Sequence, residues 1–288
     1  MHVIINLNKP SGITSRQAVT KVKRLLGAGK AGHAGTLDPQ ATGVLLICLN
    51  EATKVTRFLM DMDKQYKARI KLGERTDTCD AEGRVIESRD VSFLSEAVLI
   101  DTVRTFKGSI QQKPPMYSAV KIGGKALYKL ARKGIEIDRP DRTVHIYDIK
   151  ITSIDIPYFD VTISCSKGTY IRSICDDIGL KLGTGAHMTS LERTAVGGFH
   201  IKDSFSFDDL ASNEKQFYSI DQALVKLPVI ELDEADYCKA KHGMQIILKS
   251  FSSYNGEFVK LKDPAGNLFA VGRARSNVIS IERVLHLK

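Results

Sequence analysis

An aspartate with no acidic residue before it is the first side chain whose position suggests chemistry. Asp38 lies in the segment GHAGTLDP at 32–39, and residues 1–37 carry six lysines and arginines and no acid. A carboxylate among cations stays ionised and can act as a nucleophile. Asp-Pro is also common in plain turns, and residue chemistry by itself favours that use. Both interpretations remain open at this level.

Two further side chains could serve such a carboxylate. Tyr66 alternates with Ala68 and Ile70 on one face of an expected strand, where a core tyrosine is normal. Arg172 lies beside the apolar stripe of a helix expected at 170–181, and a solvated surface charge is the ordinary interpretation of such an arginine. Its place just after a strand-to-helix turn favours a site instead.

Metal and cofactor motifs do not occur in the chain. The five cysteines include no C-x-x-C pair, and no histidine pair has zinc-finger spacing. The segment 27–32 matches G-x-G-x-x-G, but it follows a helix, whereas a dinucleotide site follows a strand. We therefore expect reduced thiols, no metal and no cofactor.

The charge distribution suggests a polyanionic partner. The net charge is +9, and residues 101–150 carry eleven basic against five acidic side chains. Clustered positive charge favours nucleic acid, although a basic protein without any RNA role would look the same. No apolar run approaches the ~20 residues that span a bilayer, so we expect no membrane segment and a cytoplasmic protein.

The hydrophobic pattern predicts α+β content in two unequal domains, 1–227 and 228–288. Thr14 can cap a first helix whose inner face would be Val19, Val22, Leu25 and Leu26. The expected elements that follow are a glycine-rich loop at 27–35, a buried strand at 43–49, a helix at 52–60, a strand at 65–72, a helix at 95–107, a basic excursion at 111–142, and strands at 143–156 and 158–166. The last 60 residues predict a small β-rich domain with a hairpin turn at 263–267.

Four blocks of the sequence resemble a known family. The run GHAGTLDPQATGVLL at 32–46 is similar to the catalytic motif of the TruB-type tRNA pseudouridine synthases. NKPSGITS at 8–15, KQYKA at 64–68 and GTYIRS at 168–173 resemble that family's other motifs, in the same order. Residues 76–83 resemble its bacterial stand-alone branch, and the tail from about 228 resembles a shortened PUA-type RNA-binding domain.

The resemblance implies roles for individual residues. Asp38 would be the nucleophile, Tyr66 would stack on the target base and possibly take a proton, and Arg172 would pair with Asp38. His33 would enter the tRNA loop in place of the flipped base. The remaining implied pocket residues are Lys9, Tyr170 and Leu191.

The resemblance also implies fold and activity. The fold would be the pseudouridine synthase fold, with a large mixed, mainly antiparallel sheet, flanking helices and a PUA-like domain. The substrate would be uridine 55 in the T arm of tRNA, flipped out of its stack, and the excursion at 111–142 would be a mobile thumb on a monomeric enzyme. Two alternatives stay open, a non-catalytic RNA-binding or tRNA-folding module and a guide-RNA-dependent enzyme acting on ribosomal RNA.

Overall fold

The computed structural model describes residues 1–118, 120–131, 133–212, 216–248, 254 and 256–287, and a ten-stranded sheet forms its centre. Arg132, inside the predicted excursion, lies outside these residues. Across the sheet the main strands run β14 (Tyr218–Ser219), β1 (Val3–Lys9), β3 (Thr42–Leu49), β12 (Ala186–Val196), β4 (Lys64–Leu72), β11 (Tyr158–Cys165), β10 (Arg142–Asp155) and β7 (Gly108–Gln112). β2 (Ala31–Ala34) pairs with β3, and β13 (Phe199–His200) pairs with β12.

The sheet is antiparallel except at one seam. β12 runs parallel to β3, and their ladder contains only the pairs Glu192–Thr42 and Arg193–Gly43. Gly43 has φ +98°, and a Cβ there would lie 2.3 Å from the Arg193 carbonyl oxygen. Only glycine permits this close approach. The predicted large mixed, mainly antiparallel sheet is confirmed, and the seam places the loop before β3 against β12.

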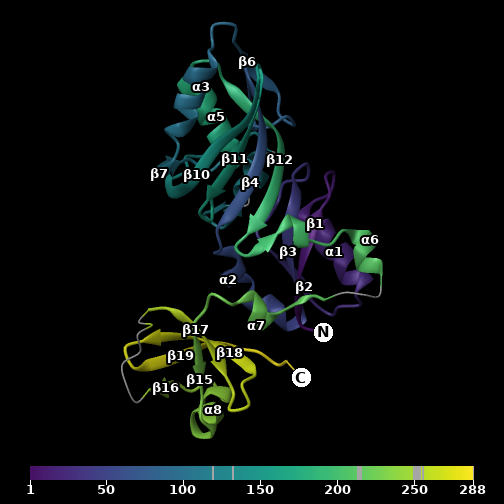
Figure 1. The fold of residues 1–288 in the computed structure, drawn as a ribbon, viewed down its shortest axis with the longest axis vertical. Coiled ribbons are helices and arrows are strands. Elements are labelled where there is room, and N and C mark those ends of the chain that lie inside the picture. Colours follow the sequence, from purple (N-terminus) through teal and green to yellow (C-terminus); the bar gives the residue numbers. More distant parts are fainter. Residues whose placement is uncertain (119, 132, 213–215, 249–253, 255, 288) are drawn as a thin grey trace.

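Helices flank the sheet, and two of them cover one face of its β4–β7 half (Figure 1). The α-helices are α1 (Ser15–Leu25), α2 (Thr56–Met60), α3 (Glu96–Arg104), α4 (Leu127–Ala131), α5 (Ile171–Leu182), α6 (Phe207–Ala211), α7 (Ile220–Ala223) and α8 (Glu234–Lys241). The covering pair is α3 and α5. Two 3₁₀ turns, η1 (Asn50–Val55) and η2 (Ile201–Asp203), complete the helical segments.

The first helix begins as predicted and buries most of the predicted face. Thr14 and Gln17 form the predicted capping box. Val22 is fully buried, and Val19 and Leu26 pack against the core as expected. Leu25 is the exception at 42% exposed, and Ala18, which was not predicted, is fully buried.

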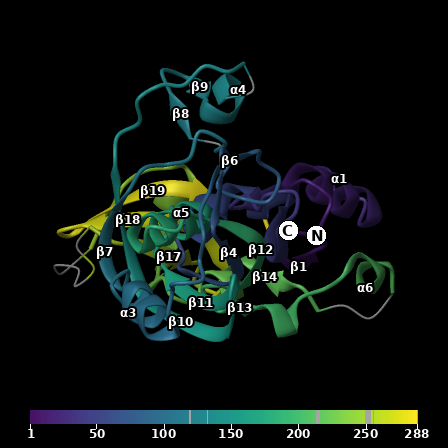
Figure 2. The same ribbon diagram turned by 90° about the horizontal axis from the view of Figure 1, so that it is seen from above.

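Two expected segments differ from the structure. The glycine-rich segment 27–35 is not a loop throughout, because residues 31–34 form β2 and hydrogen-bond to β3. Residues 31–34 are mostly glycine and alanine, which have low β-propensity, so the sequence does not indicate a strand there. Hydrogen bonds to β3 stabilise the strand instead. The helix expected at 95–107 ends earlier, at Arg104. In the excursion, β8 (Lys121–Ile122), β9 (Lys125–Ala126) and α4 project away from the sheet (Figure 2).

A second sheet of five strands lies at one end of the molecule (Figure 1). Its order is β15 (Val229–Glu231), β17 (Phe258–Lys262), β18 (Leu268–Arg275), β19 (Val278–Val284) and β16 (Ile246–Ile247), and a further hairpin joins β5 (Glu74–Thr76) to β6 (Val85–Ser88). Arg57 of α2 bonds to Glu282 at 2.8 Å and lies against Phe258, so the two sheets are in contact through α2. No helix in the described ranges is long and apolar enough to cross a membrane.

Candidate active site

The loop between β2 and β3 carries Asp38, and hydrogen bonds hold the backbone carbonyls of residues 35–39. The side chain of Arg193 donates to the oxygens of Gly35 and Thr36, at 3.2 and 3.4 Å. The Ser15 hydroxyl both donates to and accepts from the backbone of Leu37, at 2.9 Å each. The Asp38 carbonyl accepts from the amide of residue 41, and the residue 39 carbonyl accepts from residues 9 and 12. This anchoring fixes where the Asp38 carboxylate points.

Arg172 meets that carboxylate directly. Its Nε lies 3.1 Å from Asp38 Oδ2, and one terminal nitrogen lies 3.5 Å from Oδ1. The same nitrogen donates to the Tyr117 carbonyl at 2.8 Å. Arg172 is only 6% exposed, so it is not a solvated helix charge. A planar guanidinium held on several sides orients a carboxylate as a flexible ammonium cannot.

Asp80 is a third member of this cluster that was not predicted as a site residue. Its Oδ2 lies 3.1 Å from the other terminal nitrogen of Arg172. The Thr78 hydroxyl donates to the Asp80 carboxylate, and this hydrogen bond stabilises the turn between β5 and β6. The segment 76–83, which contains Asp80, resembles the bacterial branch of the family, and this resemblance could have pointed to a site residue there. The local sequence does not indicate that Asp80 contacts an arginine 92 residues later.

The electrostatics of Asp38 combine opposing effects. Burial raises the pKa of the Asp38 carboxyl above its usual range, and the guanidinium of Arg172 lowers it. The carboxylates of Asp80 and Glu82 raise the same pKa further, while the Lys9 ammonium lowers it. Basic neighbours in the sequence suggested a readily ionised acid, yet burial has the larger effect. Arg172 is therefore the main group that keeps Asp38 charged.

The Asp38 side chain is 38% exposed and opens onto a cavity of about 950 Å³. Asp80 and Leu191 also line this cavity, and so do Lys67 and Arg69 from the open face of β4. Aliphatic and charged groups thus meet around one carboxylate, as expected of a pocket that holds a small polar ring. Leu191, which the resemblance implies is an apolar pocket residue, is thus part of the cavity lining.

Tyr66 lies behind the cavity wall. It is 9% exposed on the covered face of β4, and its cross-strand neighbour on β12 is Arg193. Burial raises the pKa of the Tyr66 phenol, and the charge of Arg193 lowers it. Tyr66 belongs to the core cluster, as one sequence interpretation expected, and its stacking on a target base stays a prediction.

Lys9 does not line the cavity. Its side chain is fully buried, and its Nζ donates to the carbonyls of Pro10, Ile13 and Pro39 at 2.8–3.0 Å. Burial lowers the Lys9 pKa to about 8, while the Asp38 charge raises it. Lys9 therefore supports the backbone next to Asp38 from beneath.

His33 and Tyr170 lie at the ends of elements beside the site. His33 is half-buried in β2, its Nδ1 has no hydrogen-bond partner within the described structure, and burial lowers its pKa. Tyr170 is the N-cap of α5, and the Gln112 amide holds its backbone through two hydrogen bonds. Neither residue is among the described ones that line the cavity.

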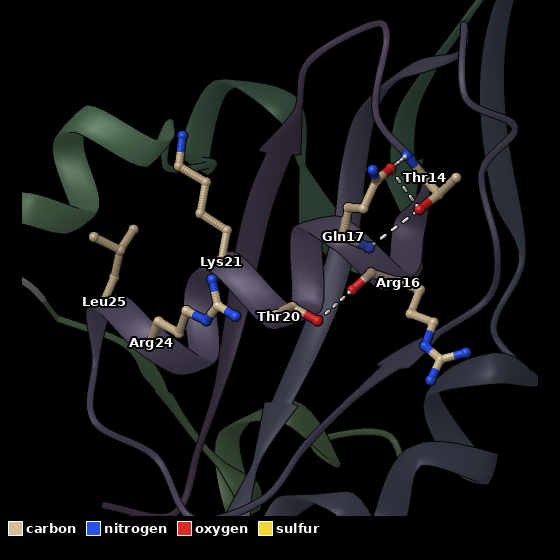
Figure 3. A pocket seen from close by; sticks show the side chains of 7 residues that line it. All are labelled: Thr14, Arg16, Gln17, Thr20, Lys21, Arg24 and Leu25. Carbon is tan, nitrogen blue, oxygen red and sulfur yellow. Dashed lines mark hydrogen bonds between the residues drawn. The ribbon is translucent and has the colours of Figure 1, made fainter.

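A separate groove runs along the outer face of α1 (Figure 3), with a volume of about 610 Å³. Arg16, Lys21 and Arg24 line it, and none of them belongs to an ion pair within the described ranges. Lys21 instead lies 4.1 Å from the Phe207 ring centroid. Cations without acidic partners remain available to phosphates.

Among the described residues, no group of three or more His, Cys, Asp or Glu is placed to hold a metal ion.

Comparisons with known proteins identify relatives of this chain. The family model for the N-terminal domain of TruB family pseudouridylate synthases matches residues 23–171, and the model for the C-terminal domain of tRNA pseudouridylate synthase B matches residues 172–228. A curated tRNA pseudouridine synthase B from Clostridium tetani is 46% identical over 85% of this chain and 86% of its own length. One from Mannheimia succiniciproducens is 40% identical over 100% of this chain and 97% of its own length.

Solved structures share the fold. An H/ACA RNP bound to a substrate RNA containing 2'-deoxyuridine superposes with a TM-score of 0.76 at 25% identity, covering 99% of this chain and 85% of the other. A Cbf5-Nop10-Gar1 complex gives a TM-score of 0.74 at 26% identity, covering 98% and 84%. The predicted pseudouridine synthase fold is therefore confirmed, and the chain belongs to the TruB family of pseudouridylate synthases.

Proposed function

We propose that this protein isomerises uridine 55 in the T arm of tRNA to pseudouridine. The observation that carries the proposal is the Asp38 carboxylate, held by Arg172 at 3.1 Å at the mouth of the cavity. The names of the curated relatives support tRNA as the substrate, at 40–47% identity. The guide-RNA alternative is less favoured, because the neighbours that are RNP assemblies are only 25–26% identical.

The proposed reaction begins with a flipped uridine, because a base inside the stack cannot reach the carboxylate. Asp38 attacks the uracil ring or the anomeric carbon, and the N1–C1' bond breaks. The freed ring rotates, C5 bonds to C1', and the bond to Asp38 breaks. The proton on C5 leaves, and N1 takes up a proton. The motif resemblance assigns Tyr66 the stacking contact with the base, and its phenol is a candidate acceptor for the proton from C5. Leu191 would contact the ring, and Arg172 would keep Asp38 ionised and aimed.

RNA binding is proposed for surfaces outside the cavity. Arg16, Lys21 and Arg24 on α1 and the basic excursion at 111–142 would bind phosphates, and His33 would fill the space left by the flipped base. Residues 228–288 would form a second, PUA-like RNA-binding domain. Lys9 and Tyr170 would support the pocket walls. We propose that the enzyme acts in the cytoplasm as a monomer without a cofactor.

Tritium release tests the proposal. Forming the C5–C1' bond expels the hydrogen on C5, so tRNA carrying [5-³H]uridine should release one tritium per T arm. A T arm with uridine 55 replaced by cytidine is the matched control. Release from the control at the same rate would contradict the proposed position. RNA binding without any release would favour the non-catalytic alternative.

A further inference from the structure

Arg193 is a buried cation that the proposed reaction does not use. It lies in β12 at the seam with β3, and its side chain is 1% exposed. Within the described part of the chain, none of the ion pairs includes it. An arginine buried without an acid carries a large desolvation cost, so its presence calls for a specific set of partners.

Those partners are the backbone around the catalytic loop. Nε donates to the Val44 carbonyl at 2.7 Å, and the two terminal nitrogens donate to the carbonyls of Gly35 and Thr36. One guanidinium therefore ties the start of β3 to the residues just before Asp38. Because Gly43 lets the two backbones approach closely, the Arg193 side chain reaches the loop without a water between them.

The charge of Arg193 also reaches the groups around the site. It lowers the pKa of the Tyr66 phenol, whose Cα is its cross-strand partner, and it lowers the pKa values of Lys9 and His33. In each case burial is the larger effect. A neutral side chain at position 193 would therefore leave the Tyr66 phenol harder to ionise.

We propose that Arg193 is a positioning residue for the isomerisation, holding the Asp38 loop in place against β3. The inference rests on the proposed function. Within the described structure Arg193 has no hydrogen bond to the Asp38 carboxylate, so it acts through the backbone of Gly35 and Thr36 and through its charge next to Tyr66. Lysine can donate to carbonyls that converge on one nitrogen, as Lys9 does, but it cannot reproduce three nitrogens spread over a planar fork.

The test compares Arg193→Lys and Arg193→Met with a control variant, Arg75→Met. Arg75 is a partly buried arginine whose guanidinium binds Asp176 and Glu87, and in the described structure it neither lines the cavity nor bonds to the Asp38 loop. The measurements are single-turnover tritium release on saturating tRNA, the Kd for tRNA, the melting temperature and the pH profile of the rate. Misplacing a reacting group by about 1 Å costs roughly a hundredfold in rate.

We expect Arg193→Lys to lose at least tenfold and Arg193→Met about a hundredfold in rate, with Kd within threefold of wild type. The rate profile of Arg193→Met should move to higher pH, because the Tyr66 phenol loses a neighbouring positive charge. Arg75→Met should lose stability but keep its rate. Wild-type rates in both Arg193 variants, or a loss that is equal at every pH and matched by Arg75→Met, would overturn the inference. If the wild-type enzyme releases no tritium, the proposed function fails instead.

Discussion

Replacing Arg172 with lysine should separate orientation of the Asp38 carboxylate from simple charge pairing. Arg172 contacts two carboxylates and one carbonyl at once, with Nε on Asp38, one terminal nitrogen on Asp80 and the other on the Tyr117 oxygen. A lysine keeps the positive charge, but its donors all lie on one nitrogen, so it cannot reach groups that are spread around a planar fork and leaves some of them free to move.

The size of the effect follows from that geometry. Two nitrogens of Arg172 orient the Asp38 carboxylate, at 3.1 and 3.5 Å from its two oxygens. A single ammonium would let the carboxylate turn, which we take to displace its oxygens by about 1 Å. A shift of that size costs about a hundredfold in rate, or about 2.7 kcal/mol of barrier at 1.36 kcal/mol per tenfold. Arg172→Met should be worse at neutral pH, since removing the cation raises the Asp38 pKa further and a higher pH should restore part of the rate.

The assay is single-turnover tritium release on saturating tRNA, with melting temperature as the folding control. Arg75→Lys is the matched variant, because Arg75 also forms a two-point bond to a carboxylate, Asp176, at 2.8 and 3.1 Å, but lies outside the cavity lining. It should lose stability and keep its rate. A wild-type rate in Arg172→Lys, or the same loss of rate in Arg75→Lys, would refute the reasoning.

Four further outcomes are expected. Asp38→Asn should abolish turnover with tRNA affinity nearly intact, and residual activity within tenfold of wild type would contradict its proposed role. Chelation with EDTA should leave turnover of a pre-folded stem-loop unchanged, whereas its loss would reveal a metal. Lys9 should titrate near pH 8 in an NMR titration of ¹³C-labelled lysine, and a value near 10.5 would be inconsistent with its burial. Between pH 8 and 10.5 the unfolded chain binds more protons at Lys9 than the folded chain does. The contribution of Lys9 to the free energy of unfolding should therefore rise with pH across that window. Neutralising the basic excursion should lower the log–log salt slope of tRNA binding by about one unit per lost phosphate contact, and an unchanged slope would exclude it from the interface. The residues neutralised are Lys121, Lys125, Lys129, Arg132 and Lys133.

Local sequence determined the elements that carry the site. The alternation in 65–72 predicted that Tyr66 faces the core, and Thr14 and Gln17 form the predicted capping box. The apolar run at 43–49 is fully buried in β3, directly after the Asp38 loop. These features depend on neighbours within a few residues, so period and capping chemistry suffice to predict them. The motif resemblance added the roles of Asp38 and Arg172, which periodicity could not supply.

Only the tertiary structure decided which charges are buried and what they contact. Arg172 lies off the apolar stripe of α5, yet it is buried because the turn at 78–80 and the segment around Tyr117 close over it. Lys9 and Arg193 lie inside the protein without an acid within hydrogen-bond reach, and backbone carbonyls satisfy them. Such contacts join residues up to 158 positions apart, and their stability depends on burial and on carbonyls that any residue can present. No side-chain pattern in the sequence predicts which backbone carbonyls come together in the fold. The hydrogen bonds of Lys9 and Arg193 to the Asp38 loop could therefore be identified only in the folded structure.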